Sequence, residues 1–305
     1  MGMSKTQDLF QNLTDKIVAM IEQGQAGNWQ KPWKALAGSG LHSNAKTKKA
    51  YQGFNQLMLM VVAAEQGYSQ AVWATYKQWQ ELGGQVRRGE RGVKLVKWGR
   101  TYVCECGHKD QAPCQGEGHE QEAKVWASYF VVFNIAQQDG YKLPQAPIKN
   151  EVERQDEVER FVAATGANIQ HVPGDAAFYR PSTDTITMPL VEQFDNAQGY
   201  YGTLLHELIH WTSAPQRLGR ETGKRFGDNE YGAEELVAEL GATFLAAHFQ
   251  VETEPHIEHV SYLNSWLKTL KADPMALYKA AKLAQEATTY LLELAGMENE
   301  VSKAA

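Results

Sequence analysis

Hydrophobic residues recur at helical spacing at the start of the chain and again through most of its second half. This spacing predicts helices over residues 5–22, 54–66 and 69–82, the last of which would begin after Ser69 as N-cap and stop at Gly83. Longer helical patterns follow in the second half, at residues 199–211, 232–249, 256–270 and 275–295. Helices are therefore expected to dominate that half.

Alternating and β-branched positions predict a smaller amount of strand. We expect strands of a small antiparallel sheet within residues 85–98 and 125–135, and a β-hairpin over residues 176–189. Two prolines followed by a charge-rich run are typical of a connector between domains. The pattern thus predicts an α+β protein with one domain at residues 1–143, a linker at residues 144–150 and a mostly helical domain at residues 151–305.

Charge distinguishes the two halves of the chain. Residues 1–145 contain 17 Lys and Arg against 12 Asp and Glu, whereas the remainder contains 13 against 24. Between residues 31 and 100 the bias sharpens to 12 basic against 3 acidic residues, which favours a surface that contacts phosphate. The longest apolar run, at residues 57–64, is too short to span a membrane, and three cysteines are too few for a disulfide framework. We therefore expect a cytoplasmic protein that does not bind membranes.

The pentapeptide His206-Glu207-Leu208-Ile209-His210 is the strongest chemical signal in the chain. In an α-helix His206 and His210 lie on one face, so that two imidazoles point at one place while Glu207 lies at the adjoining edge. Apolar neighbours would bury these polar groups, which then require partners. The pattern indicates a divalent metal site, with zinc expected and manganese as the alternative, and with Glu207 as the catalytic base.

A catalytic zinc site takes a third protein ligand and leaves one position for water. The metzincin pattern requires Gly at position 213 and His at position 216, but the chain has Ser213 and Gln216, which excludes that class. We expect the third ligand to be Glu235 on the following helix. Its closest competitor is Glu234, and His248 is a more distant one.

Other residues near the motif are candidates for supporting roles. Glu239, one turn further along the second helix, is suited to accept the free N–H of a ligating histidine. Tyr200, Tyr201 and Tyr231 are candidates to hydrogen-bond a tetrahedral oxyanion. The upstream strand at residues 185–189 is expected to offer an unpaired backbone edge to an extended peptide.

The first half interleaves basic and aromatic residues. Single-stranded nucleic acid is bound by cations that contact phosphates and by aromatic faces that stack on bases. Trp73, Tyr76 and Trp79 recur at spacings of three and are assigned to a helix face and hence to the core. Loops offer better candidates, and the residues expected to contact DNA are Lys31, Trp33, Lys46, Lys48, Lys49, Tyr51, Arg87, Arg88 and Arg91.

A cysteine-containing insert lies in the same half. Three thiolates and one imidazole, from Cys104, Cys106, Cys114 and His119, would complete a tetrahedral structural zinc site. The C-x-C spacing is less typical of zinc than C-x-x-C, and the alternative is a loop with free thiols.

Both halves together resemble the ArdC-type antirestriction proteins of mobile elements. In the first half the resemblance runs through residues 29–33 (WQKPW), 51–55 (YQGFN), 73–78 (WATYKQ), 83–89 (GGQVRRG) and 132–137 (VFNIAQ). In the second half it runs through residues 178–179, 184–189, 206–211, 217–218, 226–227 and 234–240. The insert from Cys104 to His119 is not part of the family pattern.

The resemblance implies a specific domain composition and function. It implies a single-stranded DNA-binding domain at residues 1–143 and a zincin-like metallopeptidase domain at residues 151–305, which together protect incoming DNA from host restriction enzymes. Three hypotheses remain open. The protein shields DNA by binding it, or it is a metallopeptidase that DNA binding delivers to a host protein, or it is a nuclease that uses the same metal.

Overall fold

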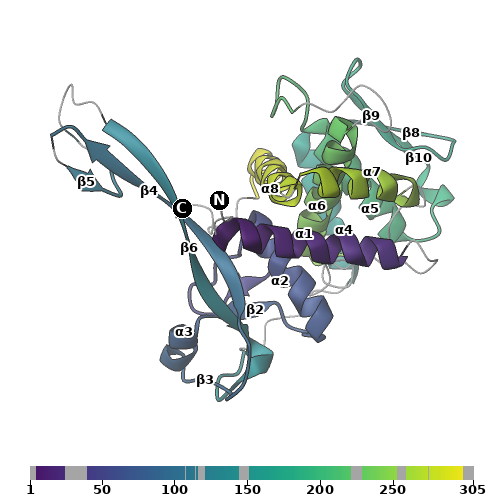
Figure 1. Ribbon diagram of the computed structural model, residues 1–305. Coiled ribbons are helices and arrows are strands. Elements are labelled where there is room, and N and C mark those ends of the chain that lie inside the picture. Colours follow the sequence, from purple (N-terminus) through teal and green to yellow (C-terminus); the bar gives the residue numbers. More distant parts are fainter. Residues whose placement is uncertain are drawn as a thin grey trace.

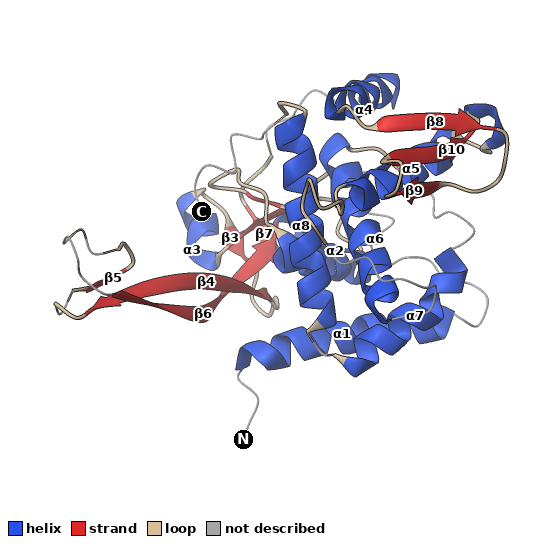
Figure 2. Ribbon diagram, turned by 90° about the horizontal axis from the view of Figure 1, so that it is seen from above, coloured by secondary structure: helices blue, strands red, loops and turns tan. Residues whose placement is uncertain are grey.

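The computed structural model describes residues 5–24, 40–106, 108–113, 115, 121–143, 151–220, 229–252, 259–273 and 275–297. Over these ranges the protein is α+β, as predicted, with a five-stranded, a three-stranded and a two-stranded sheet. Helices form the body of the molecule, a long two-stranded ribbon projects from one side of it, and the three-stranded sheet lies on another side (Figures 1 and 2).

The first half contains three helices and most of the strands in the described part of the chain. In order these elements are α1 (Lys5–Gly24), β1 (Ser43–Asn44), α2 (Gly53–Gln66), β2 (Val72–Ala74), α3 (Tyr76–Glu81), β3 (Gln85–Val86), β4 (Val93–Cys104), β5 (Lys109–Asp110), β6 (Gln121–Asn134) and β7 (Gln138–Asp139). The larger sheet has the order β1-β2-β6-β4-β5, and all its pairings are antiparallel except β1 with β2. Strands β3 and β7 form the separate two-stranded sheet.

The projecting ribbon consists of β4 and β6, which pair in register over the whole length of β4. Its base is attached to α2 by Asn55, whose side-chain amide donates to the carbonyl of Val96 at 2.8 Å and accepts from the N–H of Val96 at 3.0 Å. Gly99 allows the ring of Trp126 to lie across the opposite strand, because a Cβ at this position would lie 2.1 Å from that ring. The sequence predicted both strands but not the length of the ribbon.

The predicted helix over residues 69–82 is wrong in its first half. Residues Val72–Ala74 form β2, and α3 begins only after Thr75, whose side chain accepts from the N–H of Gln78 in a reciprocal capping box. Trp73 is fully buried within β2 and donates to Nδ1 of the buried His42 at 2.7 Å. Sheet pairing and this contact override the helical spacing of the aromatic residues.

The second half is mostly helical, as predicted. Its elements are α4 (Glu151–Thr165), β8 (Asn168–Val172), β9 (Phe178–Arg180), β10 (Thr185–Pro189), α5 (Ala197–Trp211), α6 (Asn229–Phe249), α7 (His259–Ala272) and α8 (Ala276–Leu294). Strands β9 and β10 form the predicted hairpin, and β8 pairs in parallel with β10 on its other side. Helix α6 packs against both α5 and α8.

One hydrophobic core extends through both halves. It includes residues of α1 and α2 together with residues of α5, α6 and α8. At the junction Phe10 contacts Phe54 edge to face, with ring centroids 4.7 Å apart, and contacts Tyr278 of α8 at 4.6 Å. In the described part of the chain no helix has the length and apolar character needed to cross a membrane.

Candidate metal centre

Helix α5 positions the two histidines of the motif. The helix begins after Asn196, whose side chain accepts from the N–H of Gly199 at 2.8 Å, and its apolar residues Leu204, Leu205, Leu208 and Ile209 are buried. Because these leucines and the isoleucine bind the helix to the core, His206 and His210 are held one turn apart on one face.

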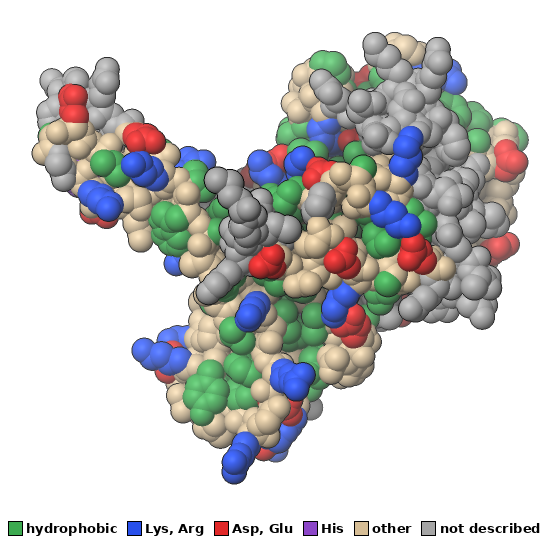
Figure 3. All heavy atoms as spheres, in the orientation of Figure 1, with side chains coloured by type: hydrophobic (Ala, Val, Ile, Leu, Met, Phe, Trp, Pro, Cys, Tyr) green, Lys and Arg blue, Asp and Glu red, His purple; other side chains and the backbone are tan. Residues whose placement is uncertain are grey.

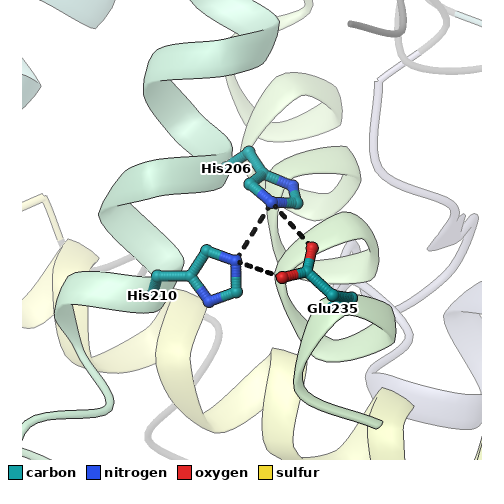
Figure 4. Close-up of side chains that lie close together, drawn as sticks. All are labelled: His206, His210 and Glu235. Atoms are coloured by element: carbon teal, nitrogen blue, oxygen red, sulfur yellow. Dashed lines mark hydrogen bonds and ion pairs between the residues drawn. The ribbon is translucent and has the colours of Figure 1, made fainter. Parts of the chain in front are cut away.

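The two histidines face a glutamate from the neighbouring helix (Figure 4). The Nε2 atoms of His206 and His210 lie 3.1 Å apart, and the carboxylate oxygens of Glu235 lie 3.4 Å and 3.5 Å from them. Ligand atoms about 2.1 Å from a tetrahedral ion are about 3.4 Å from one another, so these three groups fit a zinc-sized ion. Among the described residues this is the one group of three or more His, Cys, Asp and Glu whose ligand atoms all lie within 4.8 Å.

The charge of the surroundings also fits a cation. Four carboxylates, from Glu207, Glu234, Glu235 and Glu239, are between 2% and 6% exposed. Burial lowers the pKa of His206, but its hydrogen bonds to Glu235 and Glu239 outweigh that effect and raise this pKa to about 9. The buried carboxylates thus require positive charge between them, which a divalent ion supplies without protonating the histidines.

Each histidine has a second carboxylate behind it. Glu239 Oε1 lies 3.3 Å from Nδ1 of His206, where a supporting glutamate was predicted. Glu234 Oε1 lies 3.3 Å from Nδ1 of His210. Glu234, the predicted competitor for the ligand role, therefore lies on the opposite side of His210 from Glu235. A carboxylate at Nδ1 fixes the imidazole orientation and directs Nε2 toward the shared point.

Arg220 binds Glu234 in turn, and sequence reasoning assigned this arginine no role. Its guanidinium donates to both carboxylate oxygens, at 3.0 Å and 2.7 Å, and also to the carbonyl of Ile209 at 2.8 Å and to the Thr212 hydroxyl at 2.7 Å. The side chains of Arg220 and Glu234 are 5% and 4% exposed. This buried fork connects the end of α5 to α6 and so fixes the separation of the two ligand-bearing helices.

Glu207 lies beside the histidines, and its carboxylate accepts from the backbone N–H of Tyr179 in β9. Burial raises the pKa of Glu207, whereas the two histidines and this hydrogen bond oppose the shift. Arg217 holds β9 in place because it donates to the Tyr179 hydroxyl at 3.0 Å and to Asp184 at 3.1 Å while it stacks 3.8 Å above the ring of Trp211. Arg217 is one of the residues that carry the resemblance, at positions 217–218, but the amino-acid sequence alone did not indicate this contact with β9.

The predicted peptide-binding edge is incorrect in one respect. Strand β10 (residues 185–189) is the middle strand of its sheet and pairs with β8 and β9 on its two sides. Within the described ranges, the unpaired edge next to the motif helix therefore belongs to β9. The hairpin was predictable from its turn residues, but the parallel pairing with β8 joins residues that are 17 positions apart and had no local signal.

The predicted oxyanion tyrosines are engaged elsewhere or lie outside the described side chains. The Tyr201 hydroxyl donates to Glu159 of α4 at 2.9 Å, and the Tyr200 hydroxyl lies 3.1 Å from Nε2 of His171 in β8. Burial raises the pKa of Tyr200 to about 12. Tyr231 lies on α6, but its side chain is outside the described residues. The oxyanion role of these tyrosines stays a prediction.

Half of the predicted cysteine site can be described. Cys104 ends β4 and is buried, Cys106 is exposed in the turn that follows, and their sulfur atoms lie 3.1 Å apart. Cys114 and His119 are outside the described residues. The structural zinc site thus stays a prediction.

The predicted DNA contacts lie in two loops of the first half, and several are already engaged. Lys46 forms an ion pair with Glu81, and Arg87 pairs with Glu90 at 2.7 Å. The Tyr51 hydroxyl accepts from Asn44 at 3.1 Å. Of the other cations in these loops, Lys48, Arg88 and Arg91 are exposed and Lys49 is half-buried. Lys31 and Trp33 lie outside the described residues.

The sequence and the fold match known proteins along the whole chain. A family model for the N-terminal domain of the anti-restriction factor ArdC matches residues 7–133, and a model for a zincin-like metallopeptidase matches residues 156–283. The metal-free crystal structure of the antirestriction protein ArdC from plasmid R388 is 35% identical, covers 96% of this chain and 100% of that chain, and superimposes with a TM-score of 0.75. The chain belongs to the ArdC family.

Other relatives extend this assignment. The Mn(II)-bound structure of ArdC from plasmid R388 is 36% identical over 95% of this chain and 99% of that chain, with a TM-score of 0.69. The protein y4eC of Sinorhizobium fredii is 38% identical over 98% of this chain and 96% of its own length. A DNA primase TraC of Escherichia coli is 38% identical over 90% of this chain, which corresponds to 26% of TraC. ArdC-type sequences thus occur both by themselves and within a longer protein.

Proposed function

We propose that this ArdC-family protein binds single-stranded DNA through its first half and protects that DNA from host restriction enzymes. The observation that supports this proposal most is the match to ArdC over 96% of the chain. The excess of basic residues between positions 31 and 100 is consistent with it, because DNA affinity depends mainly on contacts to phosphates.

We also infer that His206, His210 and Glu235 hold zinc or manganese. When bound, either ion supplies Lewis acidity toward a carbonyl oxygen and a neighbouring water. Glu239 and Glu234 orient the imidazoles, and Arg220 keeps Glu234 in place. Glu207, beside this group, is suited to accept a proton from water and to return it to a leaving amine.

A second function follows from the same geometry. His206, Glu207 and the three α6 glutamates around the histidines are buried and His210 is partly buried, an arrangement that suits hydrolysis of a peptide, with the edge strand β9 next to Glu207. A metallopeptidase that DNA binding delivers to a host protein is therefore the alternative to protection by DNA binding alone.

Glu207→Gln separates the two functions. Glutamine keeps the size of the side chain and the three ligands but cannot accept the proton. We expect this variant to bind metal and to protect DNA in a restricting host as well as the wild type does, measured as the survival of transferred DNA that carries restriction sites. Loss of protection with the metal retained would favour hydrolysis instead. His206→Ala in parallel reports whether the metal itself is needed.

A further inference from the structure

The two faces of the β4–β6 ribbon differ in what they expose. In an antiparallel pair, directly opposite residues point to the same side of the sheet, and successive residues point to opposite sides. The register therefore places one set of residues on one side, which we call the Trp98 face: Lys94, Val96, Trp98 and Arg100 of β4 with Val125, Ala127, Tyr129 and Val131 of β6. Lys97, Ser128, Trp126 and Lys124 lie on the reverse face.

Large apolar side chains on the Trp98 face are left in contact with solvent. Trp98 is 46% exposed, Tyr129 37%, Val131 39% and Val125 62%, whereas Trp73 and Trp79 are fully buried. The prediction that Trp73, Tyr76 and Trp79 belong to the core is thus correct for the two tryptophans and wrong for Tyr76 of α3, which is 44% exposed. A cluster of exposed aromatic and aliphatic side chains on a projecting ribbon indicates a binding surface, because burial within the fold does not account for it.

Two cations flank this apolar surface. Lys94 lies opposite Val131 and Arg100 lies opposite Val125, and both are exposed with no ion pair to any described residue. They are six positions apart, about 20 Å along the strand, with Trp98 between them. Lys46 and Arg87 in the loops have carboxylate partners instead. The charges on the Trp98 face are therefore available to phosphates.

Trp98 also forms one wall of an open pocket where the ribbon joins the body. The pocket has a volume of about 210 Å³, and its lining includes Gly53 and Asn55 from α2 and Tyr278 and Lys282 from α8. The rings of Trp98 and Tyr278 are 5.9 Å apart. Lys282 adds a cation, although Glu286 lies 3.6 Å from it at the same rim. An aromatic wall with a cation at its rim suits a planar base attached to a phosphate.

We propose that single-stranded DNA crosses the Trp98 face, with one base stacked on Trp98 in this pocket and phosphates on Lys94 and Arg100. This inference rests on the proposed DNA-binding function and gives it a location. Stacking on Trp98 requires an unpaired base, so the site discriminates against duplex DNA. Figure 3 shows Lys and Arg side chains intermingled with hydrophobic ones along the ribbon, and acidic side chains toward its outer end, where a polyanion is disfavoured.

The test compares charge reversal on the two faces of the same ribbon. Lys94→Glu with Arg100→Glu changes the Trp98 face, and Lys97→Glu with Lys124→Glu makes the same change on the reverse face. Affinity for a fluorescent oligothymidylate is measured by anisotropy at several salt concentrations. We expect the first pair to weaken binding by at least about tenfold and to reduce the salt slope by about two, because two phosphate contacts are lost. The reverse-face pair should retain most of the affinity.

Two further measurements isolate the base contact. Trp98→Ala should weaken binding on the order of tenfold with an unchanged salt slope, and Trp98→Phe should restore part of the loss. Ultraviolet cross-linking of an oligothymidylate that carries 5-iododeoxyuridine should place the adduct in the β4 peptide, which a purely structural role of Trp98 does not predict.

The outcomes separate this inference from the function on which it rests. In one outcome the wild type binds the oligonucleotide while both reversal pairs weaken this binding equally, and in another the Trp98-face pair leaves it unchanged. In either case the proposed location is wrong and the proposed function is not contradicted. If the wild type does not bind single-stranded DNA, the proposed function fails. Preferential binding of duplex DNA would also overturn the stacking site.

Discussion

Arg220 is the residue whose loss should disturb the metal centre most without removing a ligand. Arg220→Ala leaves the carboxylate of Glu234 buried without its cation, which typically costs about 3–5 kcal/mol. His210 would lose the group that orients it, and loss of such a partner lowers metal affinity roughly 10- to 100-fold. Arg220→Lys should be intermediate, because lysine keeps the charge but not the fork.

Urea unfolding in the presence of a chelator and titration with zinc or manganese measure the two effects separately. Arg160→Ala is the matched control, since Arg160 is exposed on α4 and donates only to a backbone carbonyl among the described contacts. The control should change stability by no more than about 0.5 kcal/mol. Equal metal affinity in Arg220→Ala and in the wild type would show that Glu234 orients His210 without help.

His42, which is far in the sequence from the motif at residues 206–210, makes the stability of the protein depend on pH. Burial lowers the pKa of His42 to about 3, from the ordinary value of 6.5, and its Nδ1 accepts from Trp73. As pH falls below 6.5 the unfolded chain binds a proton at this position before the folded protein does, so stability decreases by up to about 1.4 kcal/mol per pH unit between pH 6.5 and 3. Above pH 6.5 the contribution is constant.

Urea unfolding at pH 7.5 and pH 5 measures this loss. His42→Gln removes the titrating ring while it keeps an acceptor for Trp73, and the variant should lose less stability than the wild type between the two pH values. If both lose the same amount, the dependence arises from other groups.

The role of a single residue could be predicted where it depends on neighbours close in the sequence. His206 and His210 share one helical turn, so their common face followed from spacing alone. Arg220 and Glu234 meet only because α5 and α6 pack, and no periodicity brings together these two residues, which are 14 positions apart. The loop cations were predicted from composition, which cannot show that Lys46 and Arg87 would find carboxylates.

At the scale of elements, Gly241 permits the close approach of α5 and α6. A Cβ on Gly241 would lie 2.6 Å from Cδ1 and 2.8 Å from Cγ1 of Ile209, which is closer than packing allows. Gly241→Ala must therefore push the two helices apart or force Ile209 out of its rotamer, at a cost of about 1–3 kcal/mol. Because α5 carries two of the proposed ligands and α6 the third, metal affinity should fall as well.

Gly199→Ala is the control for this helix substitution. Gly199 lies in α5, the helix opposite Gly241, but a Cβ there would make only ordinary contacts, the nearest at 3.5 Å from Asn196. Alanine at this position should be neutral or stabilise by up to about 1 kcal/mol through helix propensity. Chemical unfolding and metal titration of both variants measure stability and metal affinity. If Gly241→Ala binds metal as tightly as Gly199→Ala, the close approach of the two helices is not needed for metal binding.

A helix or strand could be predicted where the hydrophobic pattern was compatible with only one type of element. Helix α8 has a periodic apolar face and α5 and α6 are buried over most of their surface, and all three helices were found near their observed bounds. The helix expected at residues 69–82 was wrong because Trp73 fits a helix face and a buried strand equally well, and Thr75 was the better capping residue. The length of the β4–β6 ribbon depends on pairing across an insert, which periodicity in one strand does not reveal.

At the scale of the whole molecule, the continuous core couples the two halves. Helix α2 packs on α8, and α8 packs on α6, which carries Glu235. Gly53 at the start of α2 donates its N–H to the side chain of Gln285 in α8 at 3.0 Å. A sequence divided at residues 144–150 suggests two separate cores, whereas the structure joins their apolar residues into one cluster.

Metal binding in the second half should therefore stabilise the first half too. A ligand that binds only the folded state stabilises it by about 2.7 kcal/mol at a concentration 100 times its dissociation constant. With a shared core, calorimetry should show a single unfolding transition that zinc or manganese raises as a whole. Hydrogen exchange of the α2 amides should slow in parallel, although no residue of α2 touches the His206 group among the described contacts.

His206→Ala separates this coupling from nonspecific effects of the ion. The variant keeps the junction between α2 and α8 but lacks a ligand, so added metal should neither raise its unfolding temperature nor slow exchange in α2. If the wild type instead shows two transitions, of which metal shifts only one, the halves unfold independently and the shared core contributes little. A single transition that responds to metal would mean that the first half is coupled to the metal site, and α8, which also lines the pocket beside Trp98, connects the two.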